Sequence, residues 1–167
     1  MSDEYPVKIL RRVMEKSALP GELARTLPDC AKALVFAATL GHAADAALRS
    51  AFAKSASEAV ELDSRLNLRI SRACSQIQEE AAAGLGGASP VFFPGGELPL
   101  AAQSAILSLL NARRRGVYEN EAHMLLPSKT LTGVIALGVS GGARAPACGF
   151  RCAECAKPCS AKITEEL

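Results

Sequence analysis

One uncharged apolar run constrains the fold more than any other feature of this chain. Residues 33–40 read Ala-Leu-Val-Phe-Ala-Ala-Thr-Leu, and Gly41 ends the run. An apolar run of this length that stops at a glycine predicts a buried β-strand. Directly after it, from Ala44 to Phe52, apolar residues recur at spacings of three and four, which predicts an amphipathic helix. The sequence therefore predicts a strand, a tight turn and a helix in succession.

Further helices and strands follow along the chain. One helical pattern runs from about Ala59 to Ala83, and another opens at Pro99 and closes with the arginine run 113–115. Short apolar or β-rich runs separated by polar turns predict strands. These strand candidates are 116–118, 123–126 and 131–137. The predicted class is α+β: an antiparallel sheet packed with several helices, followed by a short Cys-rich C-terminal segment that binds metal.

The composition excludes several classes of function. With 167 residues and 49% hydrophobic content, the chain can bury one real core. A net charge of +2, 4% aromatic residues and no tryptophan argue against a nucleic-acid partner, because there is little charge for phosphates and little aromatic surface for bases. We interpret the arginine run as a solvated helix end that complements the helix dipole.

The chain carries no sign of a membrane or secretory segment. Its most apolar stretch, 33–53, is interrupted by His42, Asp45 and Arg49, so we expect no membrane span. The first residues, Met-Ser-Asp-Glu-Tyr-Pro, are acidic and lack the basic and then apolar order of a signal peptide. We therefore expect a cytoplasmic protein with reduced thiols.

Four of the six cysteines lie within twelve residues near the C-terminus. They are Cys148, Cys152, Cys155 and Cys159. Their spacing would also place them on one helix face, as a plain apolar stripe, but such a helix spreads the sulfurs over roughly 16 Å, too far for one metal centre. Gly149 and Pro158 favour a broken helix in which the thiolates converge. We predict a metal site, and favour a 4Fe-4S cluster with zinc as the alternative.

The two remaining cysteines lie far from this cluster in the sequence. Cys74 falls on the apolar stripe of the long helical pattern, which predicts a core thiol. Spacing does not assign Cys30. Neither His42 nor His123 has a partner at metal-ligand spacing, so we expect both to be structural or exposed.

Three segments, in a particular order, carry a resemblance to a known family. They are Ala38-Thr39-Leu40-Gly41 with Asp45, then Pro94 to Leu100, then Met124 to Thr132 with Ile135. Their order resembles the activation domain of cobalamin-dependent methionine synthase, and most closely the small stand-alone proteins of that family, some of which end in a cysteine-rich tail. The resemblance divides the chain into an activation-domain-like part, 1–138, and a Cys-rich metal or iron-sulfur tail, 139–167.

The resemblance implies a role and a set of contact residues. In that family the domain binds S-adenosylmethionine and caps a corrinoid protein, whose cob(II)alamin is reduced and remethylated. The implied partner is thus a corrinoid protein or cobalamin-dependent methyltransferase, and cobalamin would arrive with that partner. The matching ligand-loop and corrinoid-face positions here are Pro94, Gly95, Gly96, Glu97, Met124, Pro127, Ser128 and Lys129.

The loop that binds S-adenosylmethionine departs from the family pattern. The family has Arg-x-x-Pro-Gly-Tyr, whereas this chain has Val91-Phe92-Phe93-Pro94-Gly95-Gly96. A valine in place of arginine offers no charge-assisted hydrogen bonds to a carboxylate, and no tyrosine follows Gly95. We therefore expect weak S-adenosylmethionine binding or none.

The expected function is that of an accessory protein in corrinoid metabolism, which docks on a corrinoid protein and supports reductive reactivation or methyl transfer. The alternative is a stand-alone redox or metal-binding module that has lost S-adenosylmethionine binding. The sequence offers no nucleophile with a matching base and no phosphate loop of recognised spacing. Enzyme status stays open, and any activity would belong to a cobalamin-dependent methyltransferase system.

Overall fold

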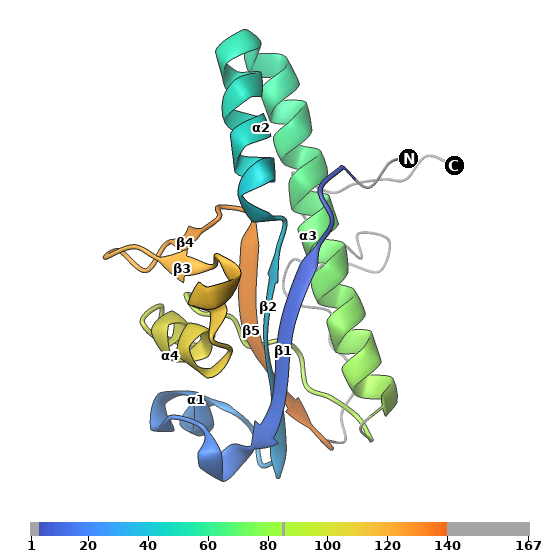
Figure 1. The fold of residues 1–167 in the computed structure, drawn as a ribbon. Coiled ribbons are helices and arrows are strands. Elements are labelled where there is room, and N and C mark those ends of the chain that lie inside the picture. Colours follow the sequence, from blue (N-terminus) through green and yellow to red (C-terminus); the bar gives the residue numbers. More distant parts are fainter. Residues whose placement is uncertain (1–3, 85, 140–167) are drawn as a thin grey trace.

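A computed structural model describes residues 4–84 and 86–139, and its central feature is a three-stranded antiparallel sheet (Figure 1). The strands are β1 (Lys8–Glu15), β2 (Lys32–Thr39) and β5 (Thr130–Leu137), in the order β1-β2-β5. The register pairs Arg12 with Val35, and Val35 in turn with Val134. β2 is therefore the central strand, as its apolar sequence requires.

The segment between helices α3 (Ala56–Gly84) and α4 (Ala102–Leu109) extends the sheet on the far side of β5. Phe92 and Val134 exchange backbone hydrogen bonds of 2.8 and 3.1 Å, and Ser89 N–H donates to the Ala136 carbonyl at 2.9 Å. This segment continues into the turn that holds Pro94 to Glu97.

Two helices in an antiparallel pair project beyond one end of the sheet (Figure 1). They are α2 (Gly41–Lys54) and α3 (Ala56–Gly84). Gly41 starts α2 at a φ of +76°, a left-handed conformation that glycine adopts without steric cost. The stripe of α3 that contains Leu66, Ile70 and Ile77 is buried against the sheet face formed by alternate residues of β2 and β5. The 29-residue helix thus covers one whole side of the sheet.

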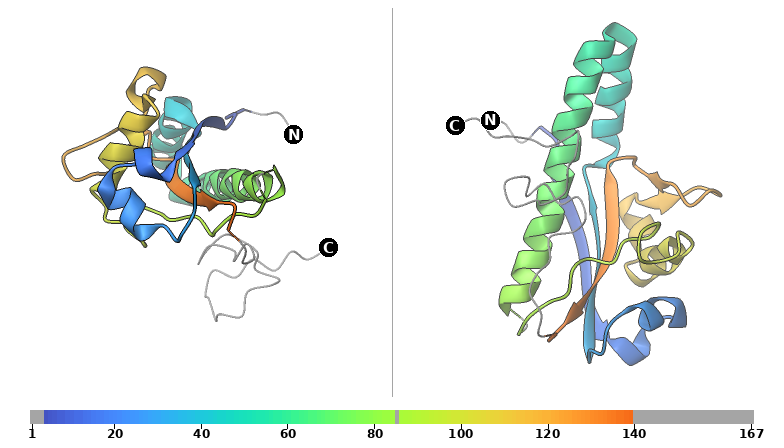
Figure 2. Two further views of the ribbon diagram at one scale, coloured as in Figure 1. Left: turned by 90° about the horizontal axis from the view of Figure 1, so that it is seen from below. Right: turned by 180° about the vertical axis from the view of Figure 1, so that it is seen from behind.

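Shorter elements cover the opposite side (Figure 2). They are the 3-10 helix η1 (Lys16–Ala18), α1 (Gly21–Thr26), α4 (Ala102–Leu109), the 3-10 helix η2 (Ala112–Arg115) and the hairpin of β3 (Tyr118–Glu119) and β4 (Leu125–Leu126). Leu23 of α1 and Ile106 of α4 pack on Val35 and Val134 in a second buried cluster. This side is therefore built from several small parts.

The α+β class predicted from the sequence is confirmed, with differences in detail. The predicted strands 116–118 and 123–126 are shortened to β3 and β4, which form a two-stranded sheet of their own. The predicted third helix ends earlier than expected, at Leu109, because Asn111 takes a left-handed conformation (φ 49°) and the arginine run forms η2 instead. β1 and α1 were not predicted at all. Within 4–84 and 86–139, no helix is both long enough and apolar enough to cross a membrane.

Candidate functional site

The predicted ligand turn is closed by its own backbone. Gly95 N–H donates to the Leu98 carbonyl at 2.9 Å, and Gly96 N–H to the Phe93 carbonyl at 3.0 Å. The Glu97 carboxylate accepts a hydrogen bond of 3.1 Å from the Phe93 N–H. Pro94, Gly95, Gly96 and Glu97 therefore form a compact turn whose main polar groups satisfy one another.

The position matched to the family's arginine is a core position. Val91 is buried in the cluster under α3. It lies against Gly133, where an added Cβ would meet Val91 Cγ1 at 2.6 Å. This close approach fixes Val91 inside the sheet packing, so its side chain does not face a ligand.

The second predicted segment, Met124 to Lys129, is clamped onto α2 and α3. Ser128 donates from its N–H and its Oγ to the two carboxylate oxygens of Asp45, at 2.9 and 2.7 Å. Lys129 Nζ lies 2.6 Å from Asp63 Oδ1 and donates to Asn67 Oδ1 at 2.7 Å.

These contacts leave only part of the segment open to a partner. The Lys129 side chain is 13% exposed, so it serves the fold and is not a free cation. Pro127 is buried, whereas Met124 is 60% exposed. Of the four residues singled out in this segment, Met124 is therefore the most available to a partner, followed by the exposed but hydrogen-bonded Ser128.

One buried side chain ties α4 to the second predicted segment and to β5. Gln103, at the start of α4, donates from Nε2 to the His123 carbonyl and accepts from Thr132 Oγ1, both at 2.8 Å. The first contact fixes the residue just before Met124, and the second fixes β5. Phe92 pairs antiparallel with Val134, so the Pro94 to Glu97 turn that follows Phe92 lies at the end of β5 that the Met124 to Lys129 segment precedes.

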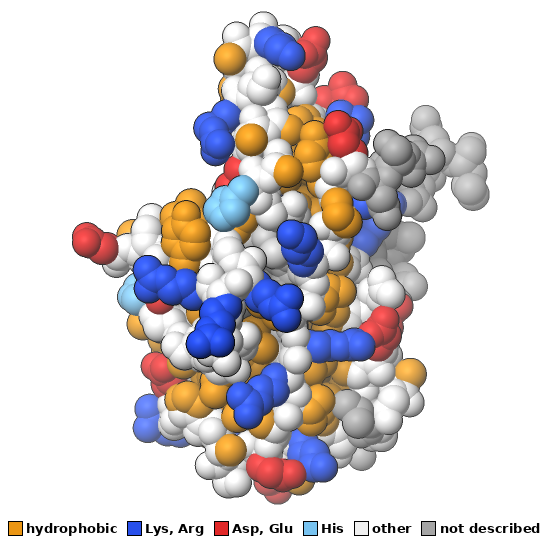
Figure 3. Space-filling view, viewed as in Figure 1, with side chains coloured by type: hydrophobic (Ala, Val, Ile, Leu, Met, Phe, Trp, Pro, Cys, Tyr) orange, Lys and Arg blue, Asp and Glu red, His pale blue; other side chains and the backbone are white. Residues whose placement is uncertain are grey.

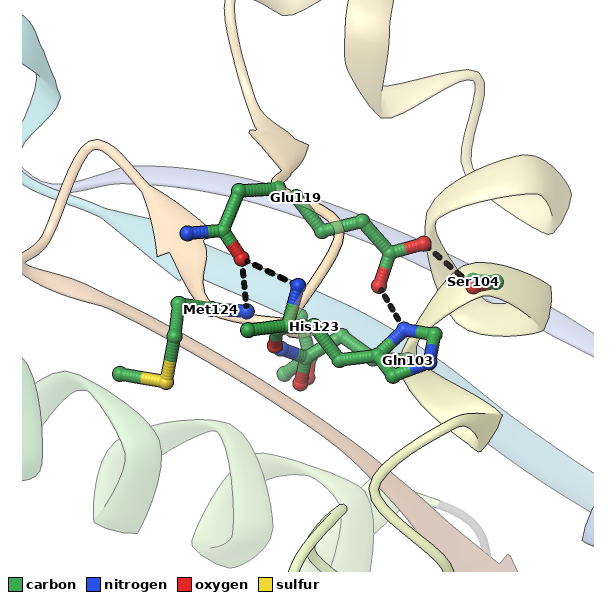
Figure 4. Close-up of polar contacts among 8 residues, drawn as sticks. Gln103, Ser104, Glu119, His123 and Met124 are labelled. Carbon is green, nitrogen blue, oxygen red and sulfur yellow. Dashed lines mark hydrogen bonds and ion pairs between the residues drawn. The ribbon is translucent and has the colours of Figure 1, made fainter.

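A polar cluster that sequence reasoning missed lies beside this junction (Figure 4). Ser104 Oγ donates to Glu119 Oε1, and the other carboxylate oxygen lies 3.0 Å from His123 Nδ1. Asn120 Oδ1 accepts from the Met124 N–H at 2.9 Å and so helps to hold the turn in which His123 has a φ of +57°. The carboxylate thus holds the imidazole from one side.

The free edge of this imidazole defines what the cluster can do. No described residue hydrogen-bonds to His123 Nε2, and the side chain is 37% exposed. A histidine oriented by a carboxylate at one nitrogen can exchange a proton or bind a metal through the other. The sequence contained only one sign of this cluster, a glutamate four residues before the histidine. In the structure the β3–β4 hairpin, and not a helix, brings Glu119 and His123 together.

An open hollow of about 790 Å³ lies next to the cluster, between α4, η2 and β3. Arg113 and Arg114 line it on the η2 side, and Glu119 and Glu121 line it on the hairpin side. Tyr118 adds an aromatic wall and lies 6.1 Å, centroid to centroid, from the His42 ring. The hollow therefore carries side chains of both charges on a lining that also includes the apolar Leu107 and Val117.

The predicted metal ligands Cys148, Cys152, Cys155 and Cys159 lie outside the described residues. Among residues 4–84 and 86–139, no group of three or more His, Cys, Asp or Glu side chains is arranged to hold a metal ion. Cys74 is the core thiol that the sequence predicted: burial raises its pKa to about 12. Cys30 is half-buried and packs against the second cluster.

No protein-family profile matches the sequence, and no curated protein matches it.

Proposed function

We propose that this is a cytoplasmic accessory protein that docks on a corrinoid protein and supports reductive reactivation of its cobalamin or methyl transfer to it. One observation supports the proposal above the others. Two of the three sequence segments that resemble the methionine synthase activation domain lie at the same end of β5, because Phe92, just before the first of them, pairs antiparallel with Val134 of β5. The docking surface would be formed by exposed Met124 and the neighbouring His123, with the Pro94 to Glu97 turn beside them.

The cysteine tail would supply the electron. Cys148, Cys152, Cys155 and Cys159 are the thiolates that would hold a 4Fe-4S cluster, which exchanges single electrons, or zinc, which exchanges none. Reactivation is a one-electron reduction of cob(II)alamin to cob(I)alamin, in which a reduced cluster would be oxidised by one electron. The proposal of electron transfer therefore needs iron, and a zinc protein would retain docking alone.

S-adenosylmethionine is not expected to bind tightly, because Val91 occupies a core position and the turn after it is closed by its own hydrogen bonds. Calorimetry with a methionine synthase activation domain as the positive control tests this expectation. Micromolar binding by this protein would mean that other residues have replaced the lost contacts.

The docking test uses two equally exposed apolar residues. Met124 and Val60 are each 60% exposed, but Val60 lies on α3, away from the proposed surface. A purified cob(II)alamin-loaded corrinoid protein is titrated anaerobically with the parent protein, Met124→Glu and Val60→Glu, while its absorption spectrum is followed. We expect association that Met124→Glu weakens and Val60→Glu does not. If no association occurs with or without a reductant, the alternative hypothesis of a stand-alone redox or metal-binding module is favoured.

The metal test is separate from the docking test. Anaerobically purified protein is analysed for iron and zinc, and its absorption near roughly 400 nm is followed during dithionite reduction. We expect a band that bleaches, and loss of bound metal when all four tail cysteines are replaced by serine. An unchanged metal content in that variant would place the site elsewhere.

A further inference from the structure

The outer edge of the sheet carries an unpaired strand with a distinct charge pattern. β1 lies at the end of the order β1-β2-β5, and no described strand pairs with its outer side. Alternate residues of such an edge strand direct backbone N–H and C=O groups outward, where another extended chain can hydrogen-bond to them. β1 therefore offers a ladder of hydrogen-bonding groups.

One face of β1 is continuous with the arginine run of η2. Leu10 packs against the cluster that contains Ala112 and Val117, and Arg12 Nη1 donates to the Leu109 carbonyl at 3.3 Å. Lys8 lies on the same face of the strand as Leu10, because side chains two residues apart in a strand share a face. β1 and η2 thus form one surface, although about a hundred residues separate them in the sequence.

This surface is positively charged. We define the basic surface as Lys8, Arg12, Arg113, Arg114 and Arg115, all of which are exposed. Within the described part of the chain, no acidic side chain forms an ion pair with any of these five. Figure 3 shows basic side chains gathered over the middle of this face, with acidic side chains mostly toward its margins.

The opposite face of β1 is apolar at two positions. Ile9 and Val13 pair in register with Ala38 and Leu34, which belong to the core under α3, yet they remain 40% and 46% exposed. Arg11 lies between them and is neutralised by Glu80 of α3 at 2.7 Å. A strand added beside β1 would therefore meet cations on one face and exposed apolar side chains on the other.

We propose that β1 and η2 together form a docking site for an acidic, extended segment of a partner protein, which adds to the sheet as a new strand beside β1. The cations of the basic surface fit carboxylates on alternate residues of that segment, and Ile9 and Val13 fit apolar residues between them. This site is independent of the corrinoid proposal, because it involves neither Met124 nor the tail cysteines.

Other occupants fit this surface less well. A second copy of β1 paired about its centre would bring Arg11 or Arg12 against its own counterpart, and like charges directly opposite one another in a sheet are destabilising. A nucleic acid would meet the cations but has no backbone that can continue a β-ladder, and it leaves Ile9 and Val13 uncovered. An acidic peptide satisfies all three features.

The probe for the test is a fluorescein-labelled, alternating Glu-Val octapeptide. Its binding to the full chain is measured by fluorescence anisotropy, and the amide hydrogen exchange of β1 is measured with and without peptide. We expect binding that weakens with salt, slower exchange in β1, and loss of binding when the peptide bonds of the probe are N-methylated, since methylation removes the hydrogens that form the ladder.

Matched charge reversals test the basic surface. Arg12→Glu with Arg114→Glu should weaken peptide binding about tenfold, as expected for two exposed ion pairs that become repulsive. The control is Arg49→Glu with Lys54→Glu, which makes the same change in net charge on exposed positions of α2. Circular dichroism checks that both variants fold.

Three kinds of result would overturn the proposal. The first is equal binding of the N-methylated probe, or no binding of the probe at millimolar concentration. The second is an equal loss of affinity in the control pair. The third is a single-stranded DNA octamer that binds more tightly than the peptide and loses affinity in Arg12→Glu with Arg114→Glu, which would make the surface a nucleic-acid site.

Discussion

The most demanding prediction concerns Lys129, which the family resemblance assigned to a partner-binding face and which the structure places in an internal ion pair. Its Nζ contacts Asp63 at 2.6 Å and Asn67 at 2.7 Å, so it ties the start of β5 to α3. Lys129→Glu would put a carboxylate beside Asp63. We therefore expect the main effect of this variant to be a lower free energy of unfolding and not a loss of partner binding.

The size of the effect follows from the exposure of the two partners. Two charges 4 Å apart attract by about 4 kcal/mol at an effective dielectric constant of 20. Measured net values are about 0.2–1 kcal/mol for exposed pairs and about 3–5 kcal/mol when a fully buried pair is broken. Lys129 and Asp63 are 13% and 35% exposed, which is between these limits. We expect Lys129→Met to cost about 1–2 kcal/mol and Lys129→Glu about 2–4 kcal/mol in unfolding free energy.

Urea denaturation followed by circular dichroism measures these changes, and a cycle with Asp63→Asn isolates the coupling between the two residues. At roughly 2–4 °C per kcal/mol, Lys129→Glu should also lower the Tm by roughly 4–16 °C. Combining it with Asp63→Lys, which restores opposite charges, should recover part of the loss. An unchanged urea midpoint for Lys129→Glu would refute the assignment and leave the lysine free for a partner.

Three further predictions test the packing and the surface charges. Gly133→Ala should destabilise by about 1–3 kcal/mol because its Cβ would lie 2.6 Å from Val91 Cγ1; the added change Val91→Ala should recover part of this, and strict additivity in urea denaturation would contradict the clash. Cys74, whose pKa burial raises to about 12, should resist iodoacetamide in the folded protein and react after unfolding; rapid labelling of the folded protein, mapped by mass spectrometry, would contradict its burial. The hydrogen bond from Arg11 lowers the pKa of Glu80, so this pair stabilises the fold above the ordinary carboxyl value and the contribution is lost as the pH falls through the lowered one. Arg11→Ala should raise that pKa in an NMR titration, and an unchanged value would show that the pair does not persist in solution.

The central elements were predictable because the pattern of apolar residues in each one, taken alone, matches the pattern of its buried positions. β2 is apolar at every position from Ala33 to Ala38 because both faces of the central strand are covered. α3 repeats its apolar residues with helical spacing because one side of it lies on the sheet. In both cases, local sequence and tertiary environment favour the same structure.

β1 could not be predicted in the same way because it is an edge strand. Its sequence, Lys-Ile-Leu-Arg-Arg-Val-Met-Glu, has charged residues on both faces and neither a clean alternation nor an apolar run. Its strand structure is stabilised by the partner β2, with which all eight of its residues pair. A pattern that depends on a neighbour far along the chain leaves no clear local signal.

The contacts at the candidate site were hidden for the same reason. Lys129 meets Asp63 across 66 residues, and Ser104 meets Glu119 across 15 residues, so neither pair has a helical spacing that the sequence would reveal. The segment resemblance singled out the Pro94 to Glu97 turn and the Met124 to Lys129 segment, which the antiparallel pairing of Phe92 with Val134 brings to the same end of β5. It did not reveal which side chains are held internally and which are exposed.

The two sides of the sheet differ in a way that explains where the exposed polar groups gather. On one side, a single helix, α3, covers the sheet and satisfies nearly all of its own backbone groups. The other side is covered by short elements that end every few residues, and each end leaves backbone groups that side chains must satisfy. Gln103 and Asn120 perform this task by binding the backbone of the hairpin, and Arg12 does so at the end of α4. These element ends hold polar side chains at the surface, and the hollow, the His123 cluster and the basic surface all lie on this side.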